Sequence, residues 1–242
     1  MRAIFIKELS GFFSSLVAYI AIGLFLMMTG LFLWVFPDSS ILENGYASLD
    51  SLFTIVPYLF MFLIPAITMR SFAEERKDGT FELLVTRPVS DLQIIAGKFF
   101  ACFALVLFSL LLTLIYYFTT SELSTPSGNI DSGAITGSYI GLLLLGGSFV
   151  GIGIFASSLS NNQIVSFAIA VFLCFFAFSG FDSLSQLISL QSIDTLVSAV
   201  GINEHYQSVG RGVLDSRDLL CFISFTSLFF MLTKTVLGAR KW

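Results

Sequence analysis

The chain has 242 residues, of which 56% are hydrophobic and only 12% are charged. Soluble domains carry about a quarter charged residues, so this composition excludes an ordinary soluble domain and predicts an integral membrane protein. The net charge of −4 says little about partners, because the charges of a membrane protein are sorted by the side of the bilayer on which they lie.

The first fifteen residues mix Arg2, Lys7 and Glu8 with isoleucine, leucine and phenylalanine, a pattern typical of a short helix lying in the membrane interface. The apolar run at 16–36 is long enough to cross the roughly 30 Å hydrocarbon core as a helix. The loop that follows, 37–51, carries acidic residues and no basic residue, so we expect it to face away from the cytosol.

The second apolar run, 52–69, contains Pro57 and Pro65. Each proline leaves a backbone carbonyl without its usual helical partner and bends the helix. Such bends are tolerated where neighbouring helices or water satisfy the carbonyls. The sequence favours bends that serve packing, and a gating hinge is the alternative.

A polar interval at 70–98 separates this run from the next one, 99–118, and holds five of the twelve basic residues. Short loops rich in arginine and lysine stay in the cytosol during insertion, so this interval is predicted to be cytoplasmic. Residues 72–84 are predicted to form an amphipathic helix, which Gly79 breaks or turns and which ends before Pro88. Its apolar residues are expected on the bilayer surface (Phe72, Phe81, Leu83 and Leu84) and its charged residues in water (Glu74, Glu75, Arg76, Lys77, Asp78 and Glu82).

Three further runs are predicted to span the membrane, at 134–157, 164–181 and 219–237. The first of these has two GxxxG spacings, Gly137/Gly141 and Gly147/Gly151, which allow another helix to approach closely. The segment at 182–216 has apolar residues at three- to four-residue steps, which fits short amphipathic helices at the outer interface. Six spans place both termini in the cytosol, where the inner segments hold ten basic residues against two in the outer ones.

Motifs for catalysis and for ion coupling are missing from the sequence. Gly97-Lys98 is followed by Phe99 and opens a span, so it is not a phosphate-binding loop, and His205 is the only histidine. The three cysteines lie in apolar runs without a CxxC spacing, so neither a disulfide nor a metal site is indicated. The middles of the first five spans lack ionisable side chains, which argues against an ion-coupled carrier. The chain is therefore predicted to be no enzyme and to take energy from another polypeptide.

The stretch EERKDGTFELLVTRPVS, followed by a GK pair, closely resembles the cytoplasmic coupling loop of ABC-2 type transporter permeases, and KELSGFFSSLVAYI resembles the opening motif of that family. The resemblance implies that the coupling helix docks in a groove of the ATPase subunit. The residues that it assigns to docking are Phe72, Glu74, Glu75, Arg76, Gly79, Thr80, Phe81, Glu82, Leu83, Leu84, Arg87 and Pro88.

A second stretch, HYQSVGRGVLDSRDLLCFIS, resembles the permease linked to gliding motility in Bacteroidota and its close ABC-2 relatives. One interpretation is a solvated turn in which Arg217 and Asp218 form local ion pairs, and the other is substrate contact. His205 could also sense pH. The residues of this outer cluster are His205, Tyr206, Arg211, Asp215, Arg217 and Asp218.

Together these features predict an all-α membrane protein with a single ABC-2 type domain over 1–242. It has six transmembrane helices, an N-terminal interfacial helix, the coupling helix and short amphipathic outer helices. The resemblance implies a multi-pass permease of the bacterial inner membrane that pairs with a second permease, identical or related, and with two cytosolic ATPases.

ATP and magnesium would bind to the ATPases and no cofactor to this chain. An envelope-facing auxiliary subunit is a further expected partner, and nucleic acid is not. The expected role is export or force transmission in gliding, and the alternatives are an ATP-independent channel, a membrane-embedded enzyme using His205, or a structural anchor.

Overall fold

The computed structural model describes residues 1–43, 47–81, 89–126, 128–183, 201–213 and 215–239. Within these ranges the protein is α-helical and has no strand, and six helices are long and apolar enough to cross a membrane. The predicted all-α fold with six spans is confirmed. In chain order the helices are α1 (Arg2–Phe13), α2 (Leu16–Trp34), α3 (Asp50–Thr68), α4 (Arg70–Lys77), α6 (Asp91–Leu123), α7 (Ser132–Leu159), α8 (Gln163–Phe175), α11 (Ile202–Val209) and α12 (Ser216–Gly238), with short turns η1 (Pro37–Ser39) and η2 (Phe176–Gly180).

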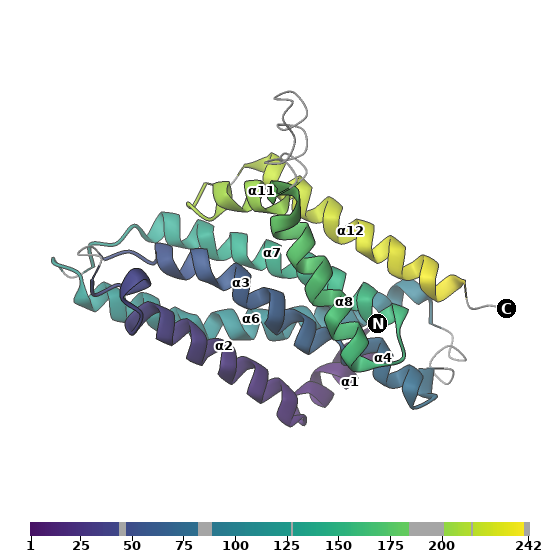
Figure 1. Cartoon of the computed structure of the whole chain (residues 1–242). Coiled ribbons are helices and arrows are strands. Elements are labelled where there is room, and N and C mark those ends of the chain that lie inside the picture. Colours follow the sequence, from purple (N-terminus) through teal and green to yellow (C-terminus); the bar gives the residue numbers. More distant parts are fainter. Residues whose placement is uncertain (44–46, 82–88, 127, 184–200, 214, 240–242) are drawn as a thin grey trace.

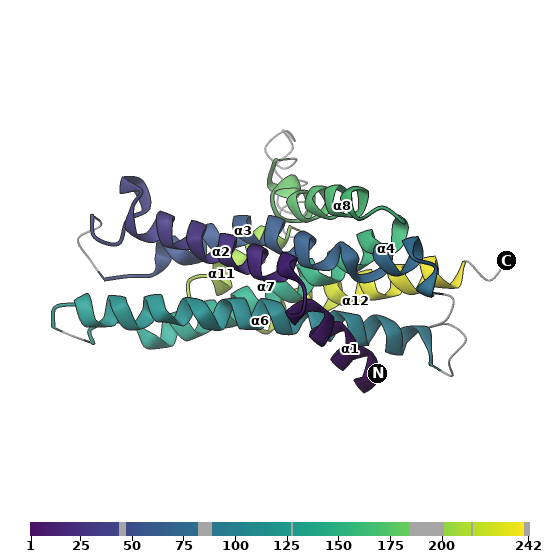
Figure 2. The same cartoon turned by 90° about the horizontal axis from the view of Figure 1, so that it is seen from below.

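Helix α7 lies at the centre of the bundle. It packs against α3, α6, α8 and α12, and 78% of its most apolar stretch is buried, compared with 17% for α12. The N-terminus, α4 and the last turns of α12 lie toward one end of the bundle, which we call the terminal end (Figure 1). The turned view shows the same arrangement, with α8 lying apart from α6 across α3 (Figure 2). The connection between α2 and α3 lies at the opposite end.

Of the two predicted GxxxG spacings in α7, Gly137/Gly141 allows a close contact. A Cβ atom on Gly137 would lie 2.6 Å from the carbonyl oxygen of Gly212, whereas one on Gly147 or Gly151 would lie 3.5 Å or more from its neighbours, an ordinary contact. Gly153, which belongs to neither spacing, allows another close contact, because a Cβ atom there would lie 2.8 Å from the Cβ of Thr68 in α3.

Polar caps fix where several helices begin. The Ser90 hydroxyl accepts from the backbone N–H of Gln93, whose side chain accepts from the backbone N–H of Ser90 in return. Asp131 and Asp215 cap α7 and α12 in the same general way. Such caps satisfy backbone donors that a helix leaves free in its first turn.

Helix α3 continues through both of its prolines. Because Pro57 has no N–H, the carbonyl of Phe53 loses its helical partner. The Tyr206 hydroxyl of α11 donates to that carbonyl at 2.6 Å. A neighbouring helix therefore satisfies this carbonyl.

The predicted boundaries are less accurate than the number of spans. Helix α6 has 33 residues, about 50 Å at 1.5 Å per residue, so it extends beyond the roughly 30 Å hydrocarbon core. It begins at Asp91, well before the predicted start at residue 99, so the GK pair lies inside the helix. In the predicted amphipathic segment 182–216, the structure has the short helix α11, and residues 184–200 lie outside the described ranges.

Candidate functional site

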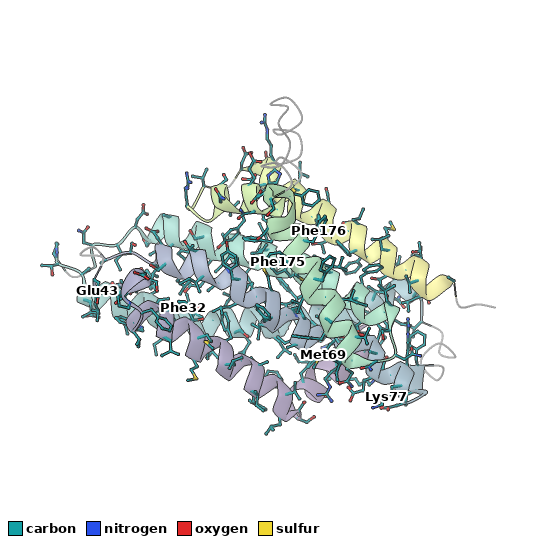
Figure 3. All side chains as sticks on the ribbon, viewed as in Figure 1. Phe32, Glu43, Met69, Lys77, Phe175 and Phe176 are labelled. Carbon is teal, nitrogen blue, oxygen red and sulfur yellow. The ribbon has the colours of Figure 1, made fainter. Side chains whose placement is uncertain are left out.

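Helix α4 follows α3 directly, with Met69 between them (Figure 3). The hydroxyl of Ser157, in α7, accepts from the backbone N–H groups of Phe72 at 2.9 Å and Ala73 at 3.1 Å, and donates to the carbonyl of Met69 at 3.0 Å. One side chain therefore satisfies three backbone groups at the joint and holds the start of α4 against α7.

The structure corrects the predicted amphipathic helix at 72–84. Helix α4 begins at Arg70 and ends at Lys77, before Gly79, whose φ of 68° is the predicted break. The backbone is helical again at Thr80 and Phe81, and residues 82–84 of the predicted helix lie outside the described ranges. Phe72 is fully buried and does not lie on a bilayer surface, and Glu75 is buried and does not face water. The reason is that α4 packs into the protein, against α7 and α8, so the face predicted to be free is covered.

Glu75 belongs to a group of four charged side chains, Lys7, Glu8, Glu75 and Lys98, which we call the ion cluster. The Lys98 ammonium lies 2.8 Å from Glu8 Oε1 and 2.9 Å from Glu75 Oε2, and it donates to the carbonyl of Ser71 at 2.5 Å. The Lys7 ammonium donates to Glu75 Oε1 at 2.6 Å. The cluster has two positive and two negative charges and joins α1, α4 and α6.

Lys98 is the most deeply buried member, with no exposed side-chain surface. Its ammonium also lies 5.0 Å from the ring centroid of Phe72. An unpaired buried charge costs several kcal/mol, whereas the surrounding carboxylates and carbonyl satisfy this one. Partial burial lowers the pKa of Lys7, but its hydrogen bond and charge interaction with Glu75 outweigh this effect, so the pKa is raised above its ordinary value.

A cleft of about 250 Å³ opens beside the ion cluster, between α1 and α4. At its edge Arg70 makes a two-bond ion pair with Glu74, with both N···O distances 2.9 Å, and donates to the hydroxyl of Ser15 at 2.6 Å. Arg70 thus links α4 to the junction of α1 and α2. The cleft is lined by Lys7, Glu8, Gly11, Phe12, Arg70, Ser71, Glu74, Glu75, Asp78 and Thr80.

The residues of the predicted outer cluster make different contacts and do not form one site. His205 Nδ1 lies 2.7 Å from Asp218 Oδ1, which joins α11 to α12. Of the two residues that one interpretation assigned to local ion pairs, Asp218 is buried and turns toward His205, and Arg217 is exposed. Asp215 caps α12, and Tyr206 is buried against α3. Arg211 lines a cleft of about 540 Å³ with residues of α3, η2 and α11.

The structure thus combines six helices that can span a membrane with the joined segment α3–α4 at one end of the bundle. The family model described as ABC-2 family transporter protein matches residues 35–242. The chain belongs to the ABC-2 transporter family. No curated protein matches it.

This ABC-2 family member is accordingly a multi-pass membrane protein and a component of membrane transport. The matched range includes α3 to α12, with Glu75 and Lys98. It begins after α1, so Lys7 and Glu8 lie outside it.

The predicted docking residues fall into four groups in this ABC-2 protein. Phe72 and Glu75 are buried, whereas Glu74, Arg76 and Phe81 are partly exposed. Gly79 and Thr80 are exposed, next to exposed Lys77 and Asp78. The remaining predicted residues, Glu82, Leu83, Leu84, Arg87 and Pro88, lie outside the described ranges.

The sequence interpretation missed the ion cluster. Lys98 was interpreted only as the second residue of the GK pair at the start of a span, and Lys7 and Glu8 as interfacial residues. The sequence does contain one signal: Lys98 directly precedes an apolar run, and a lysine that is buried at such a position needs a charged or polar partner. Its partners lie 23 and 90 positions away, and no local pattern pairs residues at such separations.

Proposed function

We propose that this ABC-2 family protein is the permease subunit of an ATP-binding cassette transporter, located in the bacterial inner membrane with both termini in the cytoplasm. A separate pair of cytosolic ATPases binds ATP and magnesium, and this chain binds neither. The permease acts with a second permease subunit, identical or related. Binding and hydrolysis of ATP move α4 and thereby the membrane helices.

The observation that carries this proposal is the joint between α3 and α4. Helix α4 lies at the terminal end, continues a membrane span after one residue and is attached to α7 by Ser157. A force on α4 therefore reaches two membrane helices directly. Exposed residues at its end, Lys77 to Thr80, offer a surface for a cytosolic partner.

The docking test uses charge changes at the exposed end of α4. Lys77→Glu combined with Thr80→Arg should reduce the amount of ATPase that co-purifies from native membranes at least about tenfold, the equivalent of 1.4 kcal/mol in binding free energy. Asp38→Lys, an exposed charge reversal near the opposite end, is the matched control and should leave co-purification unchanged. Mass spectrometry of the co-purified proteins identifies the ATPase and the second permease. A wild-type protein that brings no ATPase with it would contradict the proposal and favour an ATP-independent channel or an anchor.

The biological role that we propose is export or transmission of force to an envelope-facing partner in gliding motility. Its support is the resemblance of residues 205–224 to the gliding-linked permease. Deletion of the gene should abolish surface gliding while growth in liquid continues. Normal gliding after deletion would leave export as the proposed role.

A further inference from the structure

Three helices that are far apart in the sequence meet at Lys98. Through its ammonium group, α6 contacts Glu8 of α1 and both Glu75 and the Ser71 carbonyl of α4. Helix α1 also packs closely on α6 at a second point, because a Cβ atom on Gly97 would lie 3.1 Å from the Cβ of Ile4. The contact between α1 and α6 is therefore both polar and tightly packed.

Stability alone does not explain a buried ion cluster. Apolar residues of similar volume in place of a buried ion network are often neutral or stabilising. Apolar contacts, however, tolerate sliding, whereas hydrogen-bonded ion pairs weaken steeply when distance or angle changes. What the cluster adds to packing is a fixed relative position of α1, α4 and α6.

We propose that Lys98 is a positioning residue for energy coupling. Through the ion cluster it holds α1, α4 and the first turns of α6 as one rigid unit, so that a displacement imposed on α4 reaches α6 and α1 together. This inference rests on the proposed function, because it assumes that an ATPase displaces α4. It assigns a role to the N-terminal helix α1, for which the sequence predicts only a position in the membrane interface.

Amide hydrogen exchange measured by mass spectrometry tests the rigid unit first in the isolated protein. Lys98→Met keeps the length of the side chain and removes its charge, while Lys98→Arg retains the charge. Exchange in α1, α4 and the first turns of α6 should accelerate together in Lys98→Met, by about tenfold or more, while α12 remains unchanged. Lys98→Arg should stay close to wild type. Acceleration confined to α6 would overturn the rigid unit.

The coupling role is tested by adding the co-purified ATPase and a non-hydrolysable ATP analogue with magnesium. In the wild type, protection should change in α4, α1 and the first turns of α6 at once. In Lys98→Met the ATPase should still bind, but the change should be confined to α4, and Lys98→Arg should restore the response of all three. A purely structural role for Lys98 would not produce this separation.

The outcomes distinguish the two proposals. A wild-type response in α4 alone, with α1 and α6 unchanged, would overturn the positioning role and leave the proposed function intact. No response in α4 itself would contradict the proposed function, and the positioning role would fall with it.

A cross-link provides an independent test of the same unit. In the double variant Ile4→Cys and Gly97→Cys, the two Cβ atoms would be 3.1 Å apart. This distance is slightly shorter than the roughly 3.5–4.5 Å found in disulfides, so a small outward shift allows the bond. If α1 and α6 move together, oxidation should change ATP hydrolysis by the assembled complex less than about twofold, well under 1.4 kcal/mol. A tenfold loss on oxidation that reduction reverses would show that the helices must slide past each other, and would overturn the proposal.

Discussion

Single glycines determine how closely other helices approach α7. At Gly153 the side chain of Thr68 occupies the space that a Cβ atom would need, with Thr68 Cβ 2.8 Å from that position. Gly23 in α2, in contrast, has open space around it, since a Cβ atom added there would meet nothing within 4 Å. The two glycines therefore differ in packing although both lie inside membrane helices.

We predict that Gly153→Ala destabilises the protein by about 1–3 kcal/mol, because α3 and α7 must move apart to accept the methyl group. Gly23→Ala is the matched control and should be neutral or slightly stabilising, since alanine favours helix more than glycine does. Thermal unfolding in detergent, followed by circular dichroism, measures both variants. Equal melting temperatures for the two would show that the close contact with Thr68 does not limit packing.

Lys7 gives the ion cluster a pH dependence at its exposed edge. Burial opposes the charged form of this lysine, but Glu75 and Glu8 favour it more strongly, so its pKa in the folded protein is raised above the ordinary value of 10.5. A raised folded-state pKa means that the stabilisation is fully present below pH 10.5 and is lost as pH rises through the folded-state value. Since this side chain is 61% exposed, the effect is expected to be about 1 kcal/mol or less.

The corresponding measurement compares wild type with Lys7→Gln from below pH 10.5 to above it. The melting temperature of the wild type should exceed that of the variant by a constant amount at the lower values, and the difference should shrink above pH 10.5. Comparing the two proteins cancels the titration of other lysines. A difference that grows with pH would contradict the assigned interaction.

At the scale of elements, α3 and α11 are connected through a defect in one helix. Pro57 leaves the Phe53 carbonyl without its helical partner, and the Tyr206 hydroxyl supplies a replacement at 2.6 Å. The proline in a membrane helix and the position of the short helix α11 are thus physically linked. The sequence predicted the need for such a partner, but it did not predict which residue provides it.

A double-mutant cycle isolates this link. Tyr206→Phe should cost about 1–2 kcal/mol, because it leaves a buried carbonyl unsatisfied. In a Pro57→Ala background the same change should cost much less, because residue 57 then has an N–H that can reach the Phe53 carbonyl. Unfolding free energies of the four proteins give the coupling term. Additive effects would mean that the Tyr206 hydroxyl contributes independently of the helical partner that Pro57 removes, because Tyr206→Phe keeps the ring.

At the scale of the whole molecule, the lengths of the apolar runs determined what the sequence could predict. Six spans and an all-helical fold follow from apolar runs that match the bilayer thickness, and the structure confirms them. The start of α6 was misplaced because its first turns are polar and continue the helix beyond the bilayer. The faces of α4 were wrong because amphipathicity does not say whether a charged face meets water or opposite charges on neighbouring helices, here Lys7 and the buried Lys98.

Orientation across the membrane is the remaining property of the whole molecule that the sequence predicts and the fold alone does not test. The sequence has ten basic residues in the segments predicted to be inner and two in those predicted to be outer, so the end of the bundle that holds α4 should face the cytoplasm. In a background with the native cysteines replaced, we expect Asn129→Cys, exposed between α6 and α7, to react with a membrane-impermeant maleimide on cells with a permeabilised outer membrane. Lys77→Cys, exposed at the end of α4, should react only after the inner membrane is opened. The reverse labelling pattern would place α4 outside the cell, out of reach of any cytosolic ATPase, and would rule out the proposed coupling.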